Sequence, residues 1–286
     1  MRARRATPGY TARPVRIVDA HTHLLPDRLG RAIRAYFLQA LPPESFPYAP
    51  EPDLAHAALR AAGVARCWSL PYARRPGTAS ALNRWMAETW HDDALVEPAG
   101  TVHPGDDVAT VTEEALDLGL RLFKLHCAVG SFSLDDERLA PLWKRVSDRG
   151  LPVVVHLGHS PVGPTEPGEL ATLDRVATAW PEARIVLAHL AAPSVHEALA
   201  IVRRHRSLHA DLTPVVFHPV PLAPGDLDGV AHRILFGSDL PSLGMPLAEV
   251  VAHVRGLGLR PEEEQAVFAG NADRLVPPRG ATVTAS

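Results

Sequence analysis

Short apolar runs of strand length alternate with stretches of helical periodicity along most of this chain of 286 residues. Most of these runs are nearly continuous in Val, Ile, Leu and Ala, as expected for parallel strands that are buried on both faces. Eight such runs occur, at residues 15–20, 64–70, 95–102, 120–126, 151–158, 183–190, 207–213 and 232–239. Because parallel strands need crossover connections, this alternation restricts the chain to α/β architectures with a parallel sheet.

The segments between these runs carry the signals of helices. Within residues 106–119, one helix face is apolar and consists of Val108, Val111, Ala115 and Leu118. Proline suits the first turn of a helix and glycine its end, which predicts a helix over residues 141–150. Ser194 is expected to cap the helix that follows it. Pro261, followed by three glutamates, marks a further helix start.

Eight strands alternating with helices over this length are typical of a (β/α)₈ barrel, the TIM barrel. A doubly wound open sheet is the competing architecture, but no glycine-rich nucleotide-binding loop follows any of the runs. We therefore expect a single barrel domain over residues 15–278. A basic N-terminal tail is expected at 1–14 and a short C-terminal tail at 279–286.

Polar residues stand at the ends of several runs, where the mouth of a barrel holds its chemistry. They are His21, His23, Lys124, His126, His156, His189 and Asp239. In an extended chain, residues two apart project to the same side, so His21 and His23 face one point and can begin a metal site. Each residue alone has a simpler interpretation, such as a hydrogen-bonded core histidine. Two longer connections, 24–52 and 214–228, follow strand ends and are expected to lie over the same mouth.

The order of motifs resembles the amidohydrolase superfamily, in particular the branch of metal-dependent hydrolases and decarboxylases related to aminocarboxymuconate-semialdehyde decarboxylase. The motifs are VDAHTH, FKLH, VVVHLG, IVLAHLA, ILFGSDLP and a closing FAGNADRL, and they span nearly the whole chain. This resemblance implies a TIM barrel with a divalent metal held by His21, His23, His156 and Asp239. It implies that His189 either binds a second metal or assists catalysis.

The chemistry of these residue types is consistent with that ligand set. Three imidazoles and a carboxylate around Zn²⁺ leave room for a water, whose pKa the ion lowers to about 7. Asp239 can then accept the proton of that water and pass it to the leaving group. His189 can orient the water or stabilise a developing oxyanion. We favour one ion, most readily Zn²⁺, although Mn²⁺, Fe²⁺ or Co²⁺ also suit these ligands.

Lys124 is one of only two lysines in a chain that otherwise uses arginine. Where the family carries two metals, a fourth-strand lysine, carboxylated to a carbamate, bridges them; Lys124 and His189 would then become ligands. The alternative that we favour is a plain ammonium, paired with Asp239 or with a substrate carboxylate. His126 is expected to point to the face opposite Lys124 and to serve packing. Arg74, after the second run, is a weak candidate for a substrate carboxylate.

Charge and composition limit the partners. A net charge of -3 gives no electrostatic case for nucleic acid or an anionic membrane, and no run of about 18 apolar residues occurs. The N-terminal segment lacks the apolar core of a secretory signal, and two cysteines cannot build a disulfide framework, which favours the cytoplasm. The oligomeric state stays open, and a homodimer is compatible with the sequence.

The leading functional hypothesis is a metal-dependent hydrolase of a small-molecule amide, lactone or other ester. The alternative is a metal-dependent decarboxylase of a small unsaturated or aromatic carboxylic acid. A third hypothesis is a barrel that binds metal without catalysis.

Overall fold

Parallel strands lie at the centre of the computed structural model, which describes residues 15–158, 168–242 and 244–280. In these ranges the strands are β1 (Ile17–Thr22), β2 (Val64–Ser69), β3 (Val96–Pro98), β4 (Gly100–Thr101), β5 (Phe123–His126), β6 (Pro152–His156), β7 (Arg184–Leu187), β8 (Leu208–Asp211) and β9 (Ile234–Leu235). The strands form two hydrogen-bonded groups in chain order, β1 to β3 and β4 to β9, and each strand pairs in parallel with the next one in its group. Because β3 and β4 are one predicted run interrupted at Ala99, the strands correspond to the eight expected runs.

Hydrogen bonds join β1 to the segment that begins with β9. The backbone N–H of Ala20 donates to the carbonyl of Phe236, and that of His23 to the carbonyl of Leu240, both at 2.8 Å. In return, the N–H of Asp239 donates to the carbonyl of His21 at 2.8 Å. The first and last strands are therefore neighbours, and the fold is the predicted (β/α)₈ barrel. This pairing also brings Asp239 beside the H-x-H segment, more than 200 residues away in the chain.

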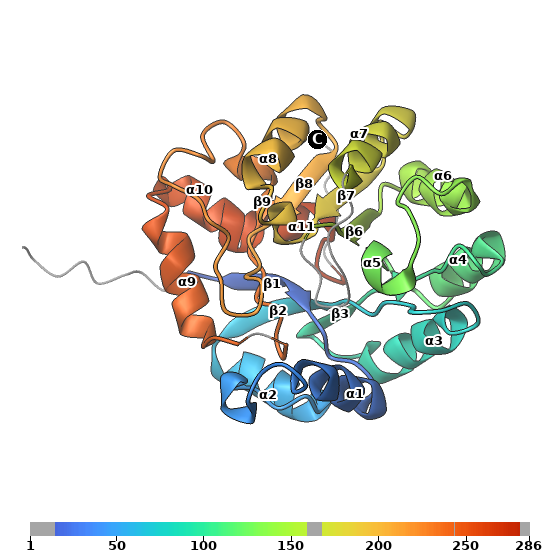
Figure 1. The fold of residues 1–286 in the computed structure, drawn as a ribbon, viewed down its shortest axis with the longest axis horizontal. Helices are drawn as coiled ribbons and strands as arrows, with labels where there is room; N and C mark the ends of the chain where they lie inside the picture. The colour runs from blue at the N-terminus through green and yellow to red at the C-terminus, as the bar shows by residue number, and fades with distance from the viewer. Residues whose placement is uncertain (1–14, 159–167, 243, 281–286) are drawn as a thin grey trace, which may run out of the picture.

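Helices surround the strands (Figure 1). The α-helices are α1 (Asp27–Phe37), α2 (Pro52–Ala61), α3 (Ala79–Trp90), α4 (Val108–Asp117), α5 (Cys127–Gly130), α6 (Ala140–Arg149), α7 (Glu169–Ala179), α8 (Val195–Arg204), α9 (Leu247–Gly256), α10 (Pro261–Gln265) and α11 (Asn271–Leu275). Short 3₁₀ turns are η1 (Pro43–Ser45), η2 (Glu137–Leu139), η3 (Ala188–Ala191) and η4 (Ala231–Arg233), and a π-helical turn, η5, spans Ala266–Gly270.

The four predicted helices are present, with one difference in capping. Val108, Val111 and Ala115 on α4 are buried as expected, and Gly150 ends α6 in a left-handed conformation at φ 63°. The side chain of Ser194 makes no capping hydrogen bond to α8, contrary to the prediction. The helix start is set instead by tertiary packing of its apolar face, which is buried at Val195, Ala198, Leu199, Ile201 and Val202.

Two faces of each strand pack differently. A cluster that includes Val18, Leu122 and Val154 is separate from the larger apolar core, to which Phe123, Val153 and Val155 belong. Residues two apart in a strand share a face. Lys124 and His126 of β5 therefore lie on the same face as Leu122, and His156 of β6 lies on the same face as Val154. These polar side chains continue the face of the smaller cluster towards the carboxyl ends of the strands.

The predicted tail at 1–14 and most of that at 279–286 lie outside the described residues. Cys67 and Cys127 are free and buried. Across the described ranges, no helix combines the length and apolar character needed to cross a membrane.

Candidate metal centre

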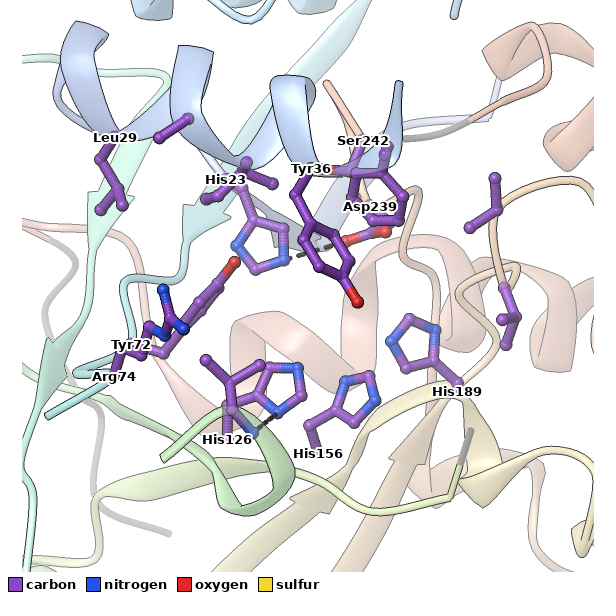
Figure 2. A pocket seen from close by; sticks show the side chains of 16 residues that line it. His23, Leu29, Tyr36, Tyr72, Arg74, His126, His156, His189, Asp239 and Ser242 are labelled. Carbon is purple, nitrogen blue, oxygen red and sulfur yellow. Dashed lines mark hydrogen bonds and ion pairs between the residues drawn. The ribbon is translucent and has the colours of Figure 1, made fainter. Parts of the chain in front are cut away.

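His21, His23 and Asp239 come together at the carboxyl end of β1. The Nε2 atom of His23 lies 2.9 Å from Oδ1 of Asp239, and Nε2 of His21 lies 3.9 Å from the same oxygen. The side chain of His21 is fully buried, whereas those of His23 and Asp239 are 10% and 13% exposed. Figure 2 shows His23 and Asp239 facing each other across one side of a pocket. Their ligand atoms lie within 4.8 Å of one another, close enough to share an ion.

Hydrogen bonds fix which nitrogen of each imidazole faces this point. The Nδ1 atom of His23 lies 2.7 Å from the carbonyl of Leu70, which can only accept, so Nδ1 carries the proton. The Nδ1 atom of His21 lies 2.8 Å from Oδ2 of Asp211. Burial, reinforced by the nearby charge of Lys124, lowers the pKa of His21 to about 3. A neutral His21 that donates from Nδ1 presents the lone pair of Nε2 to the centre.

These donors fit a divalent metal ion. Two ligand atoms about 2.1 Å from a tetrahedral ion lie roughly 3.4 Å apart, and the observed distances of 2.9 and 3.9 Å bracket that value. With Nδ1 of His23 protonated, its Nε2 and the carboxylate of Asp239 are both electron-pair donors. Their contact is stabilising only when a cation or a proton lies between them. Nitrogen and carboxylate ligands suit Zn²⁺ and neighbouring transition metals.

Asp239 is held ionised in an uncommon backbone conformation. Its φ of 63° is left-handed, a region that Asp and Asn enter more readily than other non-glycine residues. Burial alone would raise the pKa of Asp239, but the neighbouring imidazole of His23, followed by those of His21 and His189, lowers that pKa below its usual range. The carboxylate is therefore available as a ligand and as a proton acceptor.

His189 and His156 lie on the opposite side of the same pocket (Figure 2). The Nδ1 atom of His189 lies 3.1 Å from the carbonyl of Thr213, which directs the other ring nitrogen away from that backbone. The His189 ring centroid lies 4.9 Å from that of His21 and 4.8 Å from that of His156. His156 does not join the group formed by His21, His23 and Asp239. Its role as a metal ligand stays a prediction.

His126 also lines the pocket, so the expectation that it serves packing away from the site was wrong. Its ring stacks on that of His156 with centroids 3.9 Å apart. The reason is the period of the strand, because His126 and Lys124 are two residues apart and share a face.

Lys124 is fully buried and does not line the pocket. Its Nζ is 3.4 Å from Nε2 of His21. Burial lowers the pKa of Lys124 to about 8, against the opposing effects of Asp211 and Asp239. It forms no ion pair with Asp239, so that version of the ammonium hypothesis has no support. Lys144, in contrast, forms an exposed ion pair with Asp148 at 2.9 Å.

Sequence reasoning missed Asp211 and Tyr72. Asp211 is fully buried at the end of β8 and contacts His21, while the ring of Tyr72 packs against His23 and His126 with centroids 5.6 and 5.1 Å apart. The signal for Asp211 was present, because a carboxylate stands near the end of the apolar run 207–213 as Asp239 stands at the end of the run 232–239. Tyr72 follows β2 in a connection that carries no comparable pattern.

The pocket has a volume of about 220 Å³ and mainly apolar walls. One wall is formed by a single helix, α1, through Leu29, Ala32, Ile33, Tyr36 and Phe37. Val215 and Val216 contribute from the connection after β8, and Arg74 lies beside Tyr72 (Figure 2). The expectation that both long connections lie over the barrel mouth is thus confirmed.

A family model described as Amidohydrolase matches residues 18–277, which is most of the chain. The chain belongs to the amidohydrolase family. This amidohydrolase is therefore an enzyme of a metal-dependent family, and its His21, His23 and Asp239 form a group that could bind the metal. The hypothesis of a barrel without catalysis has no support from this membership.

Solved structures share the fold of this amidohydrolase. An uncharacterised TIM-barrel protein from Bordetella bronchiseptica is 23% identical with a TM-score of 0.73, over 93% of this chain and 100% of that one. The 5-carboxyvanillate decarboxylase of Sphingomonas paucimobilis is 15% identical with a TM-score of 0.65, over 92% and 99%. A putative 2-pyrone-4,6-dicarboxylic acid hydrolase from Pseudomonas putida is 18% identical with a TM-score of 0.61, over 92% and 97%. No curated protein sequence matches significantly.

Proposed function

We propose that this enzyme hydrolyses an amide, lactone or other ester bond of a small molecule at a single divalent metal, most readily Zn²⁺. The observation that carries the proposal is the position of Asp239. Its carboxylate contacts the Nε2 atoms of two histidines and is also partly exposed to the pocket. This position supports a double role for Asp239, as a metal ligand and as the group that exchanges a proton with a substrate.

His21, His23 and Asp239 would hold the ion, with His156 as the further ligand that we propose. A bound divalent ion supplies Lewis-acid chemistry and lowers the pKa of a water to about 7. Asp239 accepts the proton of the attacking water and then returns it to the leaving group. His189 faces the same space and stabilises negative charge that develops on the substrate oxygen. Its Nδ1 proton is held by backbone carbonyls, so the ring keeps its orientation during this step.

The second candidate is decarboxylation of a small unsaturated or aromatic acid. The apolar wall from α1 favours it, because a carboxylate that leaves water for apolar surroundings loses its solvation before it departs as CO₂. We also propose that the enzyme acts on a small-molecule substrate in the reducing cytoplasm. Either reaction is compatible with this setting.

A panel of aromatic esters, lactones and carboxylated aromatics, incubated with metal-loaded enzyme in ¹⁸O-labelled water, separates the two candidates. Hydrolysis is expected to place one ¹⁸O atom in the product, as measured by mass spectrometry. Release of CO₂ with no label in the product would contradict the hydrolase and support the decarboxylase. Absence of turnover across the panel, with metal bound, would contradict both.

Arg74 gives the pocket a preference for substrates with a carboxylate at a distance from the metal. Its guanidinium is exposed at the pocket wall, and among the described residues it has no hydrogen bond or ion pair. A guanidinium binds a carboxylate through two parallel hydrogen bonds. We expect Arg74→Gln to raise KM for carboxylated substrates by about tenfold or more, with little change in kcat, since charged hydrogen bonds contribute about 1.5–3 kcal/mol.

Steady-state kinetics on a carboxylated substrate and its neutral analogue measure this effect. Arg75→Gln is the matched control, because Arg75 is adjacent and also exposed but does not line the pocket. Equal losses for the two variants, or for the neutral analogue, would contradict the assignment.

A further inference from the structure

Asp211 contacts two parts of the site at once. Its Oδ2 lies 2.8 Å from Nδ1 of His21, which comes from β1. Its Oδ1 accepts hydrogen bonds from the backbone N–H groups of His189, at 2.8 Å, and Thr213, at 3.1 Å. The carboxylate is fully buried, so these contacts are not shared with bulk water.

The backbone that Asp211 contacts at His189 is unusual. His189, Leu190 and Ala191 are three consecutive non-glycine residues with left-handed φ values of 53°, 46° and 48°. Such conformations are costly for residues with a side chain and persist only where other contacts hold them. The backbone N–H of His189, the first residue of this segment, donates to Asp211. The same residue carries the imidazole that faces the pocket.

We propose that Asp211 is a positioning residue that selects the metal-binding tautomer of His21 and holds the left-handed backbone that aims His189. This inference rests on the proposed metal centre. A carboxylate accepts at both oxygens, so Asp211 requires a proton on Nδ1 of His21 and leaves Nε2 free to bind a metal. The same group accepts the N–H of His189 at its other oxygen. One side chain therefore fixes the orientation of both His21, a candidate metal ligand, and His189, a candidate catalytic group.

Asp211→Asn separates the two roles. Two backbone N–H groups point at the position of Oδ1, so the amide oxygen must occupy it and the NH₂ group must face His21. An NH₂ donor requires a lone pair on Nδ1, which moves the ring proton to Nε2, where it blocks metal binding. We expect the affinity for Zn²⁺ to fall by about 10- to 100-fold, as for other outer partners of metal-bound histidines. Competition with a chromogenic chelator measures this affinity.

The chain contains a matched control outside the site. Asp93 uses Oδ1 to accept from the N–H groups of Leu95 and Val96, and its Oδ2 lies 3.0 Å from Nε2 of His56. Asp93→Asn makes the same chemical change in the same arrangement, and we expect it to leave Zn²⁺ affinity unchanged. An equal loss in both variants would show a general effect on folding and overturn the proposal, as would wild-type affinity in Asp211→Asn.

The tautomer can be measured directly in metal-free protein. Nitrogen-15 NMR of the imidazoles, with His21 assigned through His21→Gln, is expected to show the Nδ1–H form in the wild type and the Nε2–H form in Asp211→Asn. An Nε2–H wild type would overturn the proposal even if the variant fails to fold. A wild type that binds no divalent metal would instead contradict the proposed function, while the tautomer measurement would still decide the role of Asp211.

The second role is tested by Asp211→Ala, which removes both acceptors. The amide hydrogen of His189 is expected to lose its protection from exchange in Asp211→Ala and to keep it in Asp211→Asn. Unchanged protection in the alanine variant would overturn the part of the proposal that concerns His189.

Discussion

Asp239→Asn is expected to lower kcat by at least about 10³-fold, because it removes the group that accepts and returns a proton, a contribution of about 10²–10⁴-fold. Loss of a metal ligand adds to this effect. Turnover of the substrate found in the panel, measured beside the bound metal per chain, checks the prediction. Retained turnover with full metal content would remove Asp239 from the mechanism.

Asparagine is the informative replacement at this position. Asp239 has a left-handed φ of 63°, and asparagine tolerates that conformation, whereas alanine would add backbone strain. The N–H of Ser242, which donates to the carbonyl of Asp239 at 2.7 Å, is a backbone contact and survives the change. A lost activity can then be attributed to the carboxylate.

Removal of the metal is expected to abolish activity, with recovery on adding Zn²⁺, because the reaction depends on Lewis-acid chemistry that these side chains do not supply. Since the ion binds folded protein, it should also raise the free energy of unfolding, by about 4 kcal/mol at 1,000 times Kd. Thermal unfolding with and without chelator measures this shift without any substrate. Full activity in the chelated, metal-free enzyme would contradict the metal mechanism.

A titration of the metal-free enzyme with Zn²⁺ in the presence of bicarbonate decides the role of Lys124. An endpoint at one ion per chain supports an ordinary lysine and a His189 free for catalysis. An endpoint at two would make Lys124, 3.4 Å from His21, a carbamate ligand together with His189. Its lowered pKa makes the neutral amine accessible near physiological pH, which carbamate formation requires.

The barrel could be predicted because its strands are buried on both faces and therefore have apolar interiors, as in the VVV of β6 and the IVL of β7. The candidate ligands could be predicted because polar residues interrupt these runs at one end. The break at Ala99, which divides one run into β3 and β4, has no counterpart in the hydrophobic pattern.

Other features depend on contacts that the chain order does not express. Asp211 and His21 are 190 residues apart, so their pairing follows from ring closure and not from local spacing. The left-handed turn at His189 contradicts the local preference of non-glycine residues, and tertiary hydrogen bonds maintain it. The error over His126 was different in kind, because the two-residue period of a strand already placed it with Lys124.

The reactive groups and the apolar wall of the pocket come from different parts of the chain, which affects how such an enzyme can diversify. The groups that we propose to bind the metal and to transfer the proton stand at or just after strand ends, whereas much of the apolar wall comes from one short helix, α1. That helix is one continuous segment of the chain. Exchange of this segment between relatives would alter the shape of the pocket wall while leaving the reactive groups in place. Substrate selectivity and reactivity can therefore evolve as separate traits.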